Sequence, residues 1–140
     1  MIKQQSKGPL VYGTTFLPSD VSLTAGSGVY QHVTGLQVVL PMAGTYEIMS
    51  CIRSSLSTTG AGNITAKLWD NTAGVYILAT EALLNYLAGT ASDQETTSSF
   101  GFVTVTQPTT LIVDAQFTGT GTASIIASTL GQTYLSYKKL

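Results

Sequence analysis

Few residues in this chain could support chemistry, and they lie far apart in the sequence. His32 is the only histidine and Cys51 the only cysteine. No Cys-His-Asp arrangement is apparent around His32, so we predict a structural or surface role for it. Cys51 alternates with isoleucines on a predicted strand, where a lone cysteine usually packs as a small hydrophobic residue. A single cysteine also excludes an intrachain disulfide and a cysteine-cluster metal site.

The acidic residues indicate neither a metal site nor an active site. Asp93 and Glu95 fall short of the roughly 6–8 oxygen ligands that calcium takes, and we expect them in a solvated loop at residues 89–97. A glycoside hydrolase needs paired carboxylates facing a cleft, whereas Asp114 is the only acidic residue well inside the strands predicted for the second half of the chain. We therefore predict a protein that is not an enzyme, with no catalytic residues, no metal and no cofactor.

Short motifs give no further function. Gly26-Ser27-Gly28 and Gly119-Thr120-Gly121 have no helix after them, so neither indicates a phosphate-binding loop. Asn63-Ile64-Thr65 matches a glycosylation sequon, but the N-terminus has two lysines and no apolar stretch after them, so no signal peptide is expected. No apolar run approaches the roughly 20 residues that span a bilayer, and we expect no transmembrane segment.

Charge is scarce throughout the chain. Only 9% of the residues are charged and the net charge is −1, whereas a globular domain usually has about 25% charged residues. Such a surface lacks the charges that protect exposed strand edges from association, and it offers no electrostatic footprint for nucleic acid. The composition predicts a packed subunit of an assembly, with no nucleic-acid or membrane partner.

Hydrophobic residues recur with a period of two from Val33 onward, which predicts strands. Turn signals separate about eight strands, with residues 57–62 as a loop and residues 118–121 as a turn. Residues 80–87 also have helical propensity, and we interpret them as strand or irregular structure. The pattern predicts an all-β fold, an eight-stranded antiparallel jelly-roll sandwich over residues 31–140. The expected core is Leu36, Val38, Leu40, Tyr46, Ile48, Ile52, Leu68, Val113, Ala115 and Leu135.

The first thirty residues differ from the rest. Residues 1–30 contain Pro9, Pro18 and several glycines between short apolar pieces, a mixture typical of an extended arm. A frayed tail is the alternative, but a solvated tail has no need of apolar residues. We predict an extended N-terminal arm outside the core, which docks on its own domain or on a neighbouring subunit. Its predicted partner-binding residues are Lys3, Lys7, Val11, Tyr12, Phe16 and Leu17.

Two segments carry a resemblance to a known family. The run from Leu36 to Ile48 resembles the opening of the tumour-necrosis-factor-like jelly roll, in which an apolar strand leads into Pro-x-x-Gly-x-Tyr and a second apolar strand. The ending, Leu130 to Leu140, is similar to the terminal strand of phage fibre-head and decoration domains of that type. The resemblance covers residues 33–140. It implies a homotrimer with a non-catalytic virion role and supplies no catalytic residues.

Two functions follow from this resemblance. The first is a trimeric capsid decoration or cement protein that clamps neighbouring capsid subunits through its arm, with the major capsid protein or other virion proteins as partners. The alternative is a tail-fibre or receptor-binding head that recognises a host surface glycan or protein. The short arm and missing shaft favour the first, and we expect the protein in the virion after synthesis in the host cytoplasm. Aromatic residues are typical of oligomer interfaces, and the trimer contact is predicted at Trp69, Tyr134 and Tyr137.

Overall fold

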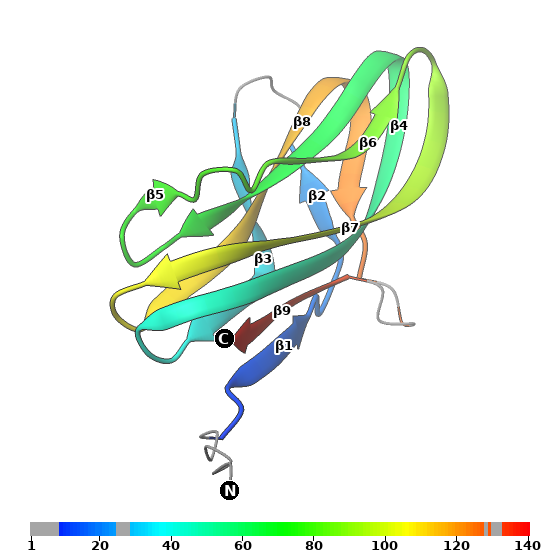
Figure 1. The fold of residues 1–140 in the computed structure, drawn as a ribbon. Helices are drawn as coiled ribbons and strands as arrows, with labels where there is room; N and C mark the ends of the chain where they lie inside the picture. The colour runs from blue at the N-terminus through cyan, green and yellow to red at the C-terminus, as the bar shows by residue number, and fades with distance from the viewer. Residues whose placement is uncertain (1–8, 25–28, 128, 130–132) are drawn as a thin grey trace, which may run out of the picture.

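The computed structural model describes residues 9–24, 29–127, 129 and 133–140. All the regular secondary structure in these residues is β-strand. The strands are antiparallel and belong to one curled sheet that folds into two packed layers (Figure 1). The described strands number nine rather than the expected eight. In chain order they are β1 (Tyr12–Phe16), β2 (Val21–Leu23), β3 (Gln31–Leu40), β4 (Gly44–Asp70), β5 (Val75–Tyr76), β6 (Ala82–Leu87), β7 (Ala91–Val105), β8 (Thr109–Ile125) and β9 (Tyr134–Lys139). The all-β prediction is confirmed.

The two layers share the long strand β4. Its first part, residues 44–58, pairs with β7 along its whole length and with β9 over residues 46–51. Its second part, residues 62–70, pairs with β5 and β6 on one side and with β8 on the other. One layer is therefore β1-β9-β4-β7, and the other is β3-β8-β4-β6 (Figure 1).

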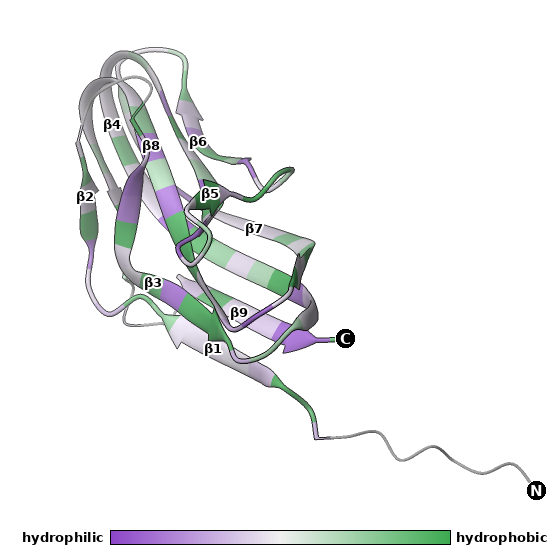
Figure 2. Ribbon diagram, turned by 90° about the vertical axis from the view of Figure 1, so that its left-hand side faces the viewer, coloured by the Kyte–Doolittle hydropathy of each residue, from purple (hydrophilic) through white to green (hydrophobic). Residues whose placement is uncertain are grey.

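The core lies between the layers and follows the predicted period of two. Figure 2 shows hydrophobic and hydrophilic residues alternating along the strands. Every residue of the predicted core is buried, from Leu36 at 0% exposure to Leu68 at 9%. The Tyr46 ring is fully buried as well, and its hydroxyl donates to the Met42 carbonyl oxygen at 2.8 Å. The predicted register is therefore correct, because a slip of one residue would turn the opposite set of side chains inward.

Two segments that were expected to leave the sheet remain in it. The predicted loop at residues 57–62 lies inside β4, and the predicted turn at residues 118–121 lies inside β8. The two segments pair with each other, with Thr58 opposite Gly121. A Cβ atom on Gly121 would lie 2.0 Å from the Ser57 carbonyl oxygen. The glycine therefore permits a close approach of two backbones and does not mark a turn.

The described part of the predicted arm belongs to the domain. β1 pairs with β9, and β2 pairs with β8. Leu17 and Leu23 are buried in the core, at 5% and 6% exposure. The expectation that the core excludes the arm is therefore wrong for these two leucines. No boundary separates residues 9–24 from the jelly-roll domain that was predicted for residues 31–140.

The ambiguous segment at residues 80–87 is a strand from Ala82 onward. Its pairing with β4 decides the structure against the helical propensity of its residues. Within the described residues, no helix is long and apolar enough to cross a membrane.

Candidate functional site

The layer β1-β9-β4-β7 carries a cluster of large hydrophobic side chains on its outer surface. The strand register places these side chains in three adjacent cross-strand rows. From β7 to β1 the rows read Phe102–Glu47–Lys138–Tyr12, Phe100–Met49–Ser136–Thr14 and Ser98–Cys51–Tyr134–Phe16. We name the large hydrophobic members of these rows the apolar face: Tyr12, Phe16, Met49, Phe100, Phe102 and Tyr134.

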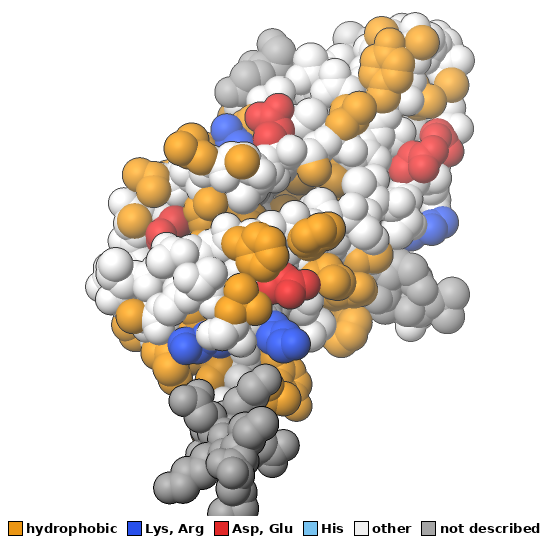
Figure 3. Space-filling model, viewed as in Figure 1, with side chains coloured by type: hydrophobic (Ala, Val, Ile, Leu, Met, Phe, Trp, Pro, Cys, Tyr) orange, Lys and Arg blue, Asp and Glu red, His pale blue; other side chains and the backbone are white. Residues whose placement is uncertain are grey.

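The apolar face is open to solvent. Phe100 is 71% exposed, Tyr12 69% and Phe102 61%. Figure 3 shows hydrophobic side chains gathered over β4 and β7, next to acidic and basic side chains. A contiguous exposed hydrophobic patch on a protein surface marks an interaction site, and aromatic residues and methionine are enriched in protein interfaces. The arrangement can therefore bind another protein surface.

The sequence builds the apolar face from strands that are hydrophobic on both sides. In β7, Val103 and Val105 are buried, whereas Phe100 and Phe102 have the opposite parity and point outward. A strand that buries one side needs hydrophobic residues only at alternate positions. The core therefore does not require these phenylalanines, and their parity is the sequence signal that could have identified the face.

The structure does not bring together the three aromatic residues predicted for the trimer contact. Tyr134 belongs to the apolar face. Tyr137 points to the inner side of β9, where its ring centroid lies 5.9 Å from that of Tyr46. Trp69 lies at the end of β4 in the other layer, with its ring centroid 4.7 Å from that of Tyr76. The residues of the face that the sequence analysis missed are Met49, Phe100 and Phe102.

The predicted partner-binding residues of the arm are also divided. Tyr12 and Phe16 point outward and belong to the apolar face. Leu17 is buried and Val11 packs against the core, so neither side chain is free to anchor a partner. The two remaining predicted residues lie outside the described part of the chain: Lys3 and Lys7.

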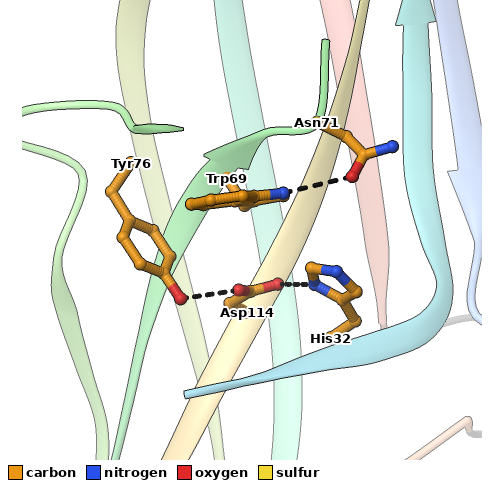
Figure 4. Close-up of polar contacts among 5 residues, drawn as sticks. All are labelled: His32, Trp69, Asn71, Tyr76 and Asp114. Carbon is orange, nitrogen blue, oxygen red and sulfur yellow. Dashed lines mark hydrogen bonds and ion pairs between the residues drawn. The ribbon is translucent and has the colours of Figure 1, made fainter. Parts of the chain in front are cut away.

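A polar cluster around Asp114 lies in the other layer (Figure 4). Asp114 is 2% exposed, and its carboxylate has two partners. The His32 Nδ1 lies 2.5 Å from Oδ1, and the Tyr76 hydroxyl donates to Oδ2 at 2.8 Å. The Trp69 indole packs against Tyr76 and donates to the Asn71 side-chain oxygen at 3.2 Å. Because a buried carboxylate needs such partners, the cluster accords with a structural role for His32.

Tyr76 in the cluster and Tyr30 beside it both have a raised pKa. Burial and then the hydrogen bond to the Asp114 carboxylate raise the pKa of Tyr76 to about 12. Burial also raises the pKa of Tyr30. The Lys67 ammonium lies 3.8 Å from the Tyr76 ring centroid and 4.1 Å from that of Tyr30. A phenol with a raised pKa stays protonated and donates, whereas a nucleophile needs the opposite shift or a base. Through these hydrogen bonds, Asp114 of β8 joins His32 of β3 to Tyr76 of β5.

Asp93 and Glu95 lie on β7 and not in the loop that was predicted for residues 89–97. A hydrogen bond with Asp93, and then the charge of Asp93, raise the pKa of Glu95. Among the described residues, no group of three or more His, Cys, Asp or Glu side chains is placed to hold a metal ion.

Comparison with known proteins identifies the fold. No protein-family model matches the chain, and no curated protein matches its sequence. Among solved structures, the chain is similar to the Eiger TNF from S. frugiperda, with a TM-score of 0.54. The alignment covers 95% of this chain and 94% of that chain at 9% sequence identity. The chain therefore has a tumour-necrosis-factor-like jelly-roll fold, as the resemblance of its sequence implied.

Proposed function

We propose that this protein is a non-enzymatic structural protein of a virus particle and that it works as a homotrimer. The observation that carries the proposal is the apolar face, which lies exposed in a chain with only 9% charged residues. Contact between copies through this face removes aromatic surface from water, the main driving force of most protein association. Glu47 and Lys138 lie between Phe102 and Tyr12 in one row of the face and supply opposite charges there. The tumour-necrosis-factor-like fold and the sequence resemblance to phage decoration domains support a trimer and a virion role.

Within the particle we propose the role of a capsid decoration or cement protein that joins neighbouring capsid subunits. Among the described strands, β1 pairs with β9 alone, so its second edge has free N–H and C=O groups. Such an edge can pair with a strand of another protein. The partners are the major capsid protein or other virion proteins. This role places the clamp at an edge strand of the domain, instead of at an arm that projects from it.

The receptor-binding alternative receives less support from the described residues. A receptor-binding head needs a recognition loop, and the loops that the sequence predicts at residues 57–62 and 89–97 are too small to nominate for that role. Residues 57–62 lie within β4, and residues 91–97 lie within β7, where they pair with β4. These segments are part of the sheet, which favours the decoration role.

Two measurements test the proposal. Sedimentation velocity and mass photometry of the full chain at low micromolar concentration should give a trimer, and a stable monomer there would contradict the assembly. Mass spectrometry of purified virus particles, separated into shells and tails, should then find the protein on the shell. A tail location would favour the receptor-binding head, and absence from both fractions would contradict the virion role.

A further inference from the structure

A cleft opens into the core between β6 and β7. Both strands pair with β4, and no backbone-to-backbone pairing joins them in the described residues. The Thr97 hydroxyl of β7 donates to the Leu84 carbonyl oxygen of β6 at 3.1 Å. Figure 1 shows the two strands diverging on the side of the molecule that faces the viewer. The cleft has a volume of about 180 Å³ and reaches the core side chains Ile48, Leu68 and Val113. The sandwich is therefore incompletely filled along this side.

Small residues create the space. Gly101 faces Ile48 across the β4–β7 pair, on the inner side of the layer. A Cβ atom on Gly101 would meet nothing within 4 Å, in contrast to the tight packing at Gly121. Ala66 and Ala82 form part of the opposite wall. An apolar cavity of about 150 Å³ stays dry and binds benzene in an engineered protein, so this cleft is large enough for a ring or a short aliphatic chain.

One wall carries two hydroxyl groups. The Ser50 and Ser99 Oγ atoms lie 2.8 Å apart, and both residues line the cleft. Within such a pair one hydroxyl donates to the other, which leaves one proton and several lone pairs for a third polar group. A ligand hydroxyl group can accept a hydrogen bond from that proton and donate one to a lone pair.

The lining does not favour a charged ligand. Lys67 and Glu81 both line the cleft, so it presents one charge of each sign. The Lys67 ammonium also lies over the rings of Tyr30 and Tyr76. Because transfer of an unpaired charge into an apolar site is unfavourable, the site suits an uncharged molecule.

We propose that this cleft is a binding site for a small uncharged amphipathic molecule, an aromatic ring or short aliphatic chain that carries one hydroxyl group. The apolar part packs on Ile48, Leu68 and Val113, and the hydroxyl group bonds to the Ser50–Ser99 pair. The proposal does not depend on the assembly role, although Phe100 of the apolar face also lines the cleft.

Methyl NMR of the full chain titrated with phenol tests the proposal. The methyl signals of Ile48 and Val113 should shift, whereas those of Leu23 and Ile125, which do not line the cleft, should stay in place. Benzene should move the same signals with weaker affinity because it cannot bond to the serines. No shift with either probe, or shifts spread over all four residues, would overturn the site.

Two variants locate the ligand. Gly101→Val fills the cleft from an extended strand position and should weaken phenol binding by at least about tenfold, or about 1.4 kcal/mol. The control Thr122→Val changes an exposed strand residue away from the cleft and should bind as the unmodified chain does. Ser99→Ala should remove the preference for phenol over benzene. Undiminished binding by Gly101→Val would overturn the location, and a preference that survives in Ser99→Ala would overturn the role of the hydroxyl pair. If Gly101→Val fails to fold, the methyl shifts of the unmodified chain still show whether phenol binds in the cleft.

Discussion

The ring of Phe16 stands edge-on to the ring of Tyr134, with the ring centroids 5.8 Å apart and the ring planes at 61°. The two residues are direct partners in the pairing of β1 with β9. Such aromatic pairs contribute about 0.5–1.5 kcal/mol beyond their buried area. The contact fixes β1 on the edge of its layer, so residues expected in a separate arm form one side of the apolar face.

Phe102→Lys should convert the proposed trimer into a monomer, because it introduces a charge into the proposed contact between copies. Phe102 is 61% exposed and lies beside Glu47, which can pair with the new lysine in the monomer. The matched control is Leu78→Lys, at a residue that is 91% exposed and outside the apolar face. Sedimentation velocity at low micromolar concentration gives the result. A trimer that survives the Phe102 change would show that the face is not the contact.

Val38→Asp should destabilise the fold by at least about 3 kcal/mol, because it puts an unpaired carboxylate into the core. Val39→Asp, at the next residue of β3, should cost about 1 kcal/mol or less. The two valines differ because Val38 is 4% exposed and Val39 is 53% exposed. Urea unfolding at one protein concentration measures the difference. Equal losses would mean that the register of β3 is wrong.

Leu17→Ala should lower the free energy of unfolding by about 2–5 kcal/mol, as is usual for a buried leucine. Leu10→Ala should have little effect, since Leu10 is 69% exposed. A chain that begins at Tyr30 lacks β1, β2 and both buried leucines, and should aggregate or melt at a much lower temperature. If the truncated chain melts at the same temperature as the full chain, residues 1–29 are an arm that does not stabilise the domain.

Tyr76→Phe should cost about 1–3 kcal/mol, because the buried Asp114 carboxylate loses a donor. Tyr86→Phe is the control, at a side chain that is 58% exposed. The folded pKa of Tyr76, about 12, exceeds the ordinary value of 10.0. The contribution of the Tyr76 hydroxyl to the free energy of unfolding is therefore complete below pH 10 and disappears as the pH rises toward 12.

Stability of the unmodified protein should accordingly fall over that range, and Tyr76→Phe should make the fall shallower. The raised pKa of Tyr30 persists in the variant, so part of the dependence should remain. Chemical unfolding at a series of alkaline pH values measures both slopes. Identical slopes in the two proteins would contradict the shift assigned to Tyr76.

The sequence was sufficient for the core because one residue type at alternate positions dictates which side of a strand is buried. Leu36, Val38 and Leu40 illustrate this, and all three are buried as expected. The same rule could not show where strands end when both partners are rich in glycine. Residues 57–62 and 118–121 look like turns separately, but they pair with each other inside β4 and β8, and residues 57, 58 and 62 pair with β7 or β6 as well.

The candidate sites were harder to predict because they depend on which strands are neighbours. Phe102 and Tyr12 are far apart in the sequence and share a row only through β4 and β9. The cleft likewise depends on Gly101 facing Ile48, a relation that no local pattern contains. Leu17 was assigned to the arm because the prolines near it suggested an extended segment. The strand just before it, β1, is recognisable only from its pairing with β9, near the other end of the chain.

The antiparallel pairing of β1 with β9 places Tyr12 opposite Lys138, so the described chain enters and leaves the domain at one corner. Tension between those two points would load the backbone hydrogen bonds between β1 and β9 one pair after another, starting at Tyr12 and Lys138. β1 would therefore separate from β9 stepwise. Shearing loads all the bonds of a strand pair together and resists a larger force. The domain is therefore mechanically weak when it is pulled apart at Tyr12 and Lys138, and it should resist a larger force when the load runs along the paired strands.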